Sequence, residues 1–393
     1  MAKKISVYFL IISVSLFLGF YFFEVYFLYK YQTTKITNQI RFKKAKEMGL
    51  YFDNRSKLEV INDYKKKKLD AFPTVHPIHF LKNKLVDKYK ILPLAGYPNV
   101  VTIFNNEFGY YEHYKSDRYG FNNNDYLWEN ENHKYVFVGD SFVHGAGIKN
   151  ENSLNGIFKK KTKIEALNLG IGGNGPLIEY ATLLEYLDFD KVKNLIWFYY
   201  SGNDLQNLSA ELTTKYLSNY LNDGFSQNLI KNQNKVNNFI KEYIETKVKY
   251  IEPKKEKKRN QSLFADSLKF SQIKKIISNS SYFTKNEVYE FINIINKINE
   301  ICKKKNINFY FVHLPTYETI VNQKVNNSIL TNKKIIFKFL ETKNIPFIDI
   351  KSELLKQNVD PKNYYPFGLQ GHFNKLGNEK IINSLIREFK FYD

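Results

Sequence analysis

The sequence predicts an α/β fold in which helices cover both faces of a parallel sheet of about five strands. Short runs rich in β-branched and aromatic residues alternate with segments whose apolar residues recur every three to four positions. Polar motifs follow three of these runs directly, as they do at the ligand-binding edge of a parallel sheet. The runs are Tyr135–Val138, Ala166–Leu169, Leu195–Tyr200, Ile307–Leu314 and Ile345–Ile350.

The composition limits the class of protein. The chain has 393 residues, of which 43% are apolar, enough for one large domain with insertions or two smaller ones. Cys302 is the single cysteine, so a disulfide framework within the chain and a cysteine metal cluster are excluded, and we expect neither metal nor cofactor. A net charge of +20 would suit nucleic acid, anionic lipid or an acidic glycan. Because the lysines are spread along the chain and no nucleic-acid module is visible, we expect no nucleic-acid partner.

A segment near the N-terminus predicts a membrane anchor. Residues 5–23 carry no charge, and five more apolar or aromatic residues follow Glu24. A helix needs about 20 such residues to cross the hydrocarbon layer. Without a convincing cleavage site, we favour an uncleaved anchor over residues 1–29 that contacts the membrane through residues 5–29. We expect a single-pass protein with its soluble domain outside the cytoplasm, although the lysines after the anchor favour the opposite orientation.

Three further regions are expected beyond the anchor. Residues 30–100 are polar and lysine-rich, and we interpret them as a stalk or peripheral segment. The α/β domain then covers residues 101–393. Within it, residues 205–285 interrupt the alternation of strands and helices, so we interpret them as an insertion over the strand ends that could act as a lid.

Four polar motifs carry the chemistry. "GDS" follows the first run, "NLGIGGNG" the second and "SGND" the third, and "GHFNKLGN" opens the last helical segment. A serine hydroxyl needs a base to become a nucleophile, and histidine has a suitable pKa. Ser141 and His372 are therefore a candidate pair. His144 is closer to Ser141 in sequence, but we expect it to be a surface or pocket-wall residue. Backbone N–H groups and an asparagine amide could stabilise the oxyanion.

In this order, the motifs resemble the four blocks of the SGNH (GDSL-type) hydrolase family, in its membrane-anchored bacterial form. The resemblance covers roughly residues 135 to 391, and "SDRYGFNNND" is similar to a segment that precedes the GDS strand in many bacterial members. It implies a flavodoxin-like three-layer α/β/α sandwich. It also implies that Ser141 is the nucleophile, that His372 is the base, and that the Ser141 N–H, the Gly173 N–H and the Asn203 side chain form the oxyanion hole.

One position departs from the family pattern. The family usually has an aspartate two or three residues before the histidine, where this chain has Gln370 and Leu369. Gln370 could orient the imidazole but cannot stabilise its positive charge as a carboxylate does. The site could therefore be a dyad, could recruit another acid such as Asp360, or could be inactive. Asp140 and Asn374 are expected to support the serine turn and the histidine loop.

These observations predict a serine esterase or acyl-transfer enzyme acting on an O-acyl ester, above all an O-acetyl ester, of a carbohydrate or cell-envelope component. A lipase or lysophospholipase is a closely related hypothesis, which a large apolar groove under residues 205–285 would support. A third is a catalytically inactive SGNH fold that binds glycan or acts as a scaffold. Geometry separates the first from the third, because an enzyme needs the Ser141 hydroxyl within hydrogen-bond reach of His372.

Overall fold

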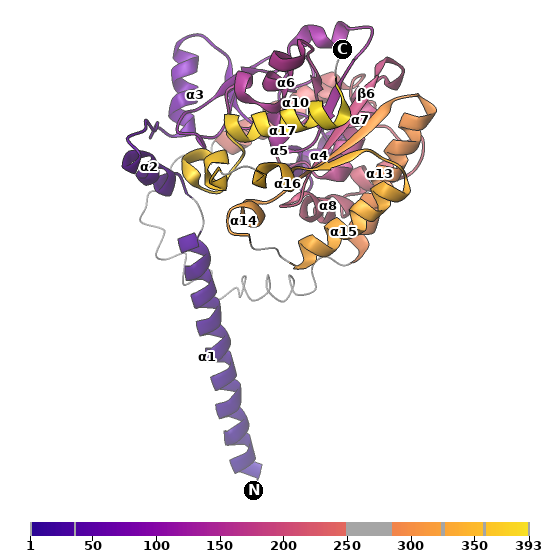
Figure 1. Ribbon diagram of the computed structural model, residues 1–393. Helices are drawn as coiled ribbons and strands as arrows, with labels where there is room; N and C mark the ends of the chain where they lie inside the picture. The colour runs from indigo at the N-terminus through magenta and orange to yellow at the C-terminus, as the bar shows by residue number, and fades with distance from the viewer. Residues whose placement is uncertain (1, 35–36, 249–284, 324–326, 357–358, 392–393) are drawn as a thin grey trace. The chain divides into compact units, whose positions relative to one another are not determined.

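The computed structural model describes residues 2–34, 37–248, 285–323, 327–356 and 359–391 (Figure 1). The described residues divide into two units, one ending at Thr37 and the other beginning at Asn38. The first unit is helix α1, Ala2–Thr34. Within it, Val7–Tyr26 has a mean hydropathy of 1.9 over 20 residues, and this length and composition suit a membrane span and a signal sequence alike.

The second unit is built on a five-stranded parallel sheet with the strand order β5-β4-β6-β7-β8. Each of the five predicted runs overlaps one of these strands, so the predicted α/β class is confirmed. In the sheet, β4 has β5 on one side, and β6, β7 and β8 follow in chain order on the other. This is the flavodoxin-like strand order. The strands are β4 (Val136–Val138), β5 (Leu167–Asn168), β6 (Asn194–Tyr200), β7 (Asn308–Leu314) and β8 (Phe347–Asp349).

Helices form a layer on each side of this sheet, because parallel strands are joined by right-handed crossovers. On one side α17 packs against α6 and α16, and on the other α13 packs against α7, α8 and α15 (Figure 1). The bounds are α6 (Leu154–Thr162), α16 (Ile350–Leu355), α17 (Lys375–Phe389), α7 (Pro176–Tyr186), α8 (Asp204–Leu212), α13 (Lys285–Lys304) and α15 (Asn327–Thr342). Short helices complete this part: α5 (Ser141–His144), α14 (Tyr317–Ile320), η2 (Asp125–Glu129), η3 (Asn150–Asn152), η4 (Phe189–Lys191), η7 (Pro361–Tyr364) and η8 (Pro366–Gly368).

Aromatic side chains fill the core between the sheet and the α6 layer. Phe137 on β4 lies 5.1 Å from Phe158 of α6 and 5.2 Å from Phe198 of β6, measured between ring centroids, in edge-to-face geometry. All three rings are buried. Edge-to-face pairs add about 0.5–1.5 kcal/mol to the free energy gained by burial alone. This packing fixes β4, and with it the turn that follows β4.

Residues 38–100, for which the sequence suggested a stalk, belong to the same compact unit as the five-stranded sheet. They form helices and one strand of a second sheet with the order β1-β2-β3, in which β1 and β2 are parallel and β2 and β3 antiparallel. Val60 and Ile61 pack with Ile103 in a small core, whereas the lysine run at 65–68 is exposed. The lysine run at the end of helix α3 (Lys57–Lys66) therefore led the sequence interpretation to miss that this helix is amphipathic. The elements are α2 (Asn38–Glu47), α3 (Lys57–Lys66), β1 (Ala71–Pro73), η1 (Pro77–His79), α4 (Lys84–Tyr89), β2 (Val101–Ile103) and β3 (His113–Lys115).

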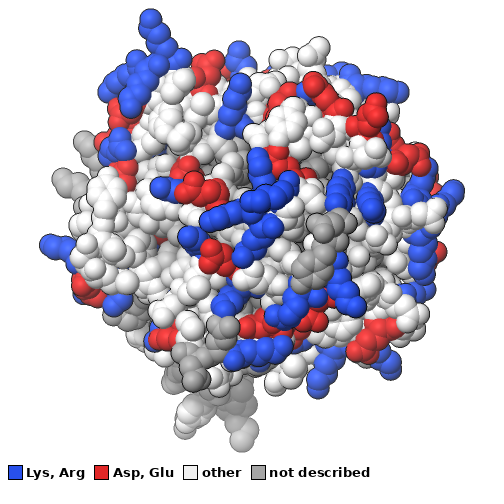
Figure 2. All heavy atoms as spheres, turned by 45° about the horizontal axis from the view of Figure 1, so that its top comes forward, with Lys and Arg blue, Asp and Glu red and all other residues white. Residues whose placement is uncertain are grey.

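The predicted insertion at 205–285 is described only up to residue 248, and residues 249–284 lie outside the described residues. Its described part contains α9 (Lys215–Ser218), η5 (Asn219–Leu221) and α10 (Gln233–Val248). Helix α10 packs on α4, where Phe239 lies 5.8 Å from Tyr89 between ring centroids. Charged side chains of both signs are interspersed on the face of the molecule shown in Figure 2.

Replacing Phe158 by alanine should lower the free energy of unfolding by about 3–5 kcal/mol, because it removes a fully buried ring and leaves a cavity under β4. Urea unfolding followed by near-UV circular dichroism measures the loss. Leu376→Ala on α17 is the matched control, since this side chain is 37% exposed, and it should change stability by no more than about 0.5 kcal/mol. Equal effects of the two substitutions would contradict the assignment of the core.

Candidate active site

Ser141 is the first residue of helix α5 and directly follows the turn after β4. Asp140 caps this helix, because its side chain accepts the Phe142 N–H at 3.0 Å. The Ser141 hydroxyl lies 3.3 Å from the Asp140 carboxylate and 2.7 Å from Nε2 of His372. The shorter distance makes His372 the main partner of the hydroxyl. Asp140 is buried, which raises the pKa of its carboxyl, and it holds the serine turn.

His372 lies in the loop before α17 and contacts Ser141 with one ring nitrogen and Glu107 with the other. Its Nδ1 is 2.7 Å from Oε2 of Glu107, and its backbone N–H donates to Oε1 at 2.6 Å. A carboxylate can only accept, so Nδ1 carries the hydrogen and Nε2 is left to accept the Ser141 proton. This is the tautomer that a general base requires.

The pKa of His372 reflects two opposing effects. Burial lowers it, but the negative charge of Glu107 and the hydrogen bond from Nδ1 outweigh burial and raise it above the ordinary imidazole value. For Glu107, burial raises the pKa of the carboxyl, but the charge of His372, its hydrogen bonds and Arg41 bring that pKa well below its usual range. Glu107 is therefore ionised when His372 takes a proton, and it stabilises the imidazolium.

Glu107 was not predicted from the sequence. It follows β2 of the small sheet, far from the motifs, and pairs with Arg41 of α2 at 3.7 Å. The same Arg41 nitrogen donates to the backbone oxygen of Gln370 at 2.7 Å, so Arg41 ties Glu107 to the histidine loop. A side chain on Gly371 would collide with the Glu107 carboxylate, which explains the glycine before His372. In the sequence, only Gln370 and Gly371 before His372 could have indicated that a distant segment supplies the carboxylate.

Neither acid substitute considered from the sequence reaches the imidazole. The Gln370 side chain is exposed and forms no hydrogen bond with a described residue, so it is not seen to orient His372. Asp360 caps η7 by accepting the Lys362 N–H at 3.0 Å. Asn374 does support the loop, because it accepts the Gly377 N–H at 3.2 Å and donates to the Asn363 oxygen at 2.7 Å.

The predicted oxyanion donors lie at the same edge of the sheet as Ser141, because β4, β5 and β6 are parallel neighbours. Gly173 lies in the loop after β5 with φ at +76°, a conformation that favours glycine. A Cβ on the neighbouring Gly172 would lie 3.6 Å from Cβ of Ser141. Asn203 is half-buried at the start of α8. Neither the Gly173 N–H nor the Asn203 side chain bonds to another described residue, so both are available to a ligand.

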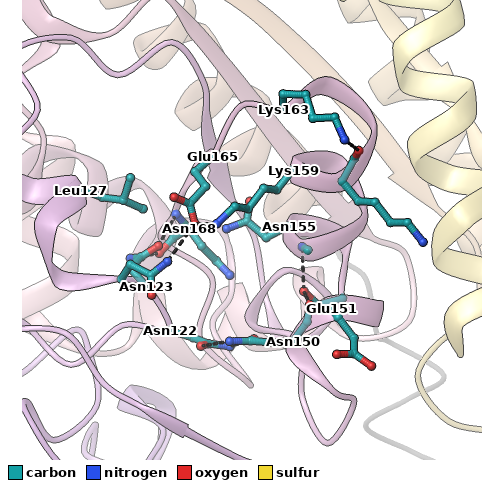
Figure 3. A pocket seen from close by; sticks show the side chains of 14 residues that line it. Asn122, Asn123, Leu127, Asn150, Glu151, Asn155, Lys159, Lys163, Glu165 and Asn168 are labelled. Atoms are coloured by element: carbon teal, nitrogen blue, oxygen red, sulfur yellow. Dashed lines mark hydrogen bonds and ion pairs between the residues drawn. The ribbon is translucent and has the colours of Figure 1, made fainter.

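An asparagine-rich segment supports the loops around this edge. The side chain of Asn123 donates to the oxygen of Asn168 at 2.9 Å and accepts its N–H at 2.9 Å, as Figure 3 shows. Asn122 donates to the backbone oxygen of His144 at 3.1 Å. These residues line a cavity of about 590 Å³ that includes neither Ser141 nor His372 in its wall. The hydrogen bonds of "GFNNND" thus brace the ends of β5 and α5.

Comparisons with known proteins find no matching family model and no matching curated protein. Solved structures that the chain resembles include a protein of the lipolytic G-D-S-L family from Desulfitobacterium hafniense DCB-2, with 17% identity and a TM-score of 0.37 over 65% of this chain and 99% of that one. They also include an acetyl xylan esterase, with 14% identity and a TM-score of 0.37 over 65% of this chain and 98% of that one. A lipase/acylhydrolase from Enterococcus faecalis has 14% identity and a TM-score of 0.37 over 66% and 95%.

Replacing Glu107 by glutamine should slow the labelling of Ser141 by a fluorophosphonate by roughly 10²- to 10⁴-fold, because the imidazolium loses its counter-charge. The acid limb of the pH–rate profile should also move to lower pH, because the carboxylate that raises the pKa of His372 is gone while Arg41 remains. Gln370→Ala is the control and should stay within about threefold of wild type. A larger effect at Gln370 than at Glu107 would contradict the assignment.

Proposed function

We propose that this protein is a serine ester hydrolase of the SGNH type, with Ser141 as nucleophile, His372 as base and Glu107 as the acid of the triad. One observation carries the proposal: the continuous hydrogen-bonded chain from the Ser141 hydroxyl through both nitrogens of His372 to the Glu107 carboxylate, with distances of 2.7 Å at each step. The positions of Ser141, Gly173 and Asn203 after the carboxyl ends of β4, β5 and β6 support it further.

The proposed reaction has two steps. Nε2 of His372 takes the hydroxyl proton while Oγ of Ser141 attacks the ester carbonyl, and the oxyanion is stabilised by the N–H groups of Ser141 and Gly173 and by the Asn203 amide. The same nitrogen then returns the proton to the leaving alcohol. Water or a sugar hydroxyl next attacks the acyl-serine and gives its proton to Nε2, which passes it to Oγ of Ser141 as the acyl–oxygen bond breaks. Hydrolysis and acyl transfer therefore share this intermediate and differ in the acceptor.

The relocated acid argues against a catalytically inactive scaffold. Gln370 raised that alternative, because a triad without a carboxylate cannot stabilise the imidazolium. Glu107 supplies the carboxylate from another part of the chain and accepts from both Nδ1 and the backbone N–H of His372. Glu107 and Arg41 are both mostly buried, and burying two charged groups costs desolvation free energy. A scaffold without catalytic activity would not need this ion pair.

A polar pocket favours a carbohydrate over a lipid as the alcohol part of the substrate. It has a volume of about 420 Å³ and shares Glu107 with the triad, so it lies beside the triad, and its wall includes neither Ser141 nor His372. Amide, hydroxyl and charged side chains suit a ligand rich in hydroxyl groups, whereas a lipase needs an apolar groove. We therefore infer an O-acyl, above all O-acetyl, carbohydrate or cell-envelope ester. The polar lining consists of Asn38, Arg41, Ser56, Lys57, Asn105, Asn106 and Glu107, with Tyr111 beside them.

The apolar helix α1 supports a proposal on location. If Val7–Tyr26 spans a membrane, the catalytic unit is held at the membrane surface. A substrate in the cell envelope would then be reached more readily than a soluble metabolite. We propose a single-pass protein with the catalytic unit outside the cytoplasm.

Ser141→Ala and His372→Ala should each abolish labelling of the full chain by a fluorophosphonate, read as intact mass, and should abolish release of acetate from O-acetylated glycans. The reason is that the probe and the ester both need the activated hydroxyl. Ser201→Ala is the control, because the Ser201 hydroxyl donates to the Leu314 oxygen at 3.2 Å and should remain dispensable. A folded wild-type protein that is not labelled would refute the proposed function.

A further inference from the structure

Two histidines hold the backbone of Gly172, the residue before the proposed oxyanion donor Gly173. The Gly172 oxygen contacts Nδ1 of His76, and because a carbonyl oxygen only accepts, Nδ1 of His76 must carry the hydrogen. The Gly172 N–H donates to Nδ1 of His144 at 3.2 Å. His144 is buried, and its other nitrogen lies 2.9 Å from the Tyr114 hydroxyl. Burial therefore contradicts the expectation of a surface position for His144.

The contact with His76 acts on the group that is to stabilise the oxyanion. The oxygen of Gly172 and the N–H of Gly173 belong to one peptide group, and the described chain has no cis peptide bond. In a trans peptide these two groups point in opposite directions. A donor fixed at the oxygen therefore fixes the direction of the N–H on the other side. It also draws electron density toward the oxygen, which makes the N–H a stronger donor.

His76 is suited to this task because it is neutral at ordinary pH. Burial lowers the pKa of its imidazole to about 4, and nearby positive charge on His79, Lys57 and His372 lowers it further, against the effect of the hydrogen bond to Gly172. A neutral ring donates through Nδ1 without placing a second positive charge beside His372. His76 follows β1 of the small sheet and lies in none of the four motifs.

We propose that His76 is a positioning residue of the oxyanion hole, which holds and polarises the 172–173 peptide through its Nδ1–H donor. This inference rests on the proposed function for its catalytic consequence. Removing the donor leaves Gly173 in place but lets its peptide group rotate and weakens its N–H. The effect should therefore fall on the transition state, where the oxyanion exists, rather than on substrate binding.

A matched pair of substitutions isolates the donor. Leucine and asparagine have similar size and shape, but only the asparagine amide can place an N–H near the position of Nδ1. With 4-nitrophenyl acetate, His76→Leu should lower kcat by roughly 10- to 100-fold, less than the loss of a whole donor, and should leave KM within about threefold. The inhibition constant of phenylboronic acid, whose tetrahedral adduct places an oxygen in the hole, should rise by a similar factor. His76→Asn should stay within about fivefold of wild type, and His79→Leu, the neighbouring histidine, within about twofold.

A second readout does not need activity. With ¹⁵N-glycine in the full chain in detergent, the amide nitrogen of Gly173 should shift upfield in His76→Leu, because the oxygen of its peptide group loses a donor, and should stay near the wild-type position in His76→Asn. The proposal is overturned if both variants lose activity equally, or if the Gly173 resonance is the same in both. Absence of labelling in wild type would refute the proposed function alone, since the resonance still tests the contact.

Discussion

The hydrogen bond between Nδ1 of His372 and the Glu107 carboxylate is the contact on which the proposed chemistry depends. It fixes the tautomer of His372, orients the ring toward Ser141 and places a negative charge where the imidazolium would form. The contact joins the C-terminal loop to the small sheet, so the two sheets of the catalytic unit must both be in place before the three side chains can line up. Arg41 completes the arrangement by binding Glu107 and the histidine loop together.

The small sheet explains how one peripheral segment can supply more than one part of the site. Strands β1 and β2 are parallel neighbours, and His76 and Glu107 each follow the end of one of them. Parallel neighbours end at the same edge of a sheet, so both side chains are delivered to the same side. Glu107 reaches His372, and His76 reaches the loop that contains Gly173. Residues 38–115 are thus a structural part of the candidate site and not a spacer.

Electrostatics within the site follow from burial and pairing. Desolvation alone would neutralise a buried carboxylate, but Glu107 stays ionised because His372 and Arg41 compensate its charge. Among the described residues no carboxylate pairs with His76 or His144, and burial lowers the pKa of both rings, which keeps them neutral. In the proposed mechanism the three histidines near Ser141 therefore have different tasks: His372 exchanges a proton with Ser141, and the other two hold a backbone segment.

The sequence by itself determined the class of fold, the five strands and the positions of Ser141, Gly173, Asn203 and His372 at strand ends or in the closing loop. These features depend on local periodicity and on motifs whose spacing is set by strand and turn geometry, which a single chain displays directly. Only the tertiary structure brought Glu107 to the imidazole, placed residues 38–100 in the catalytic unit and brought His76 to the Gly172 oxygen. Glu107 lies 265 residues from its partner, and no local pattern records which distant loop meets the imidazole. Contacts of this kind depend on how two sheets pack. Gln370 could therefore indicate that the usual carboxylate is absent, but not which residue takes its place.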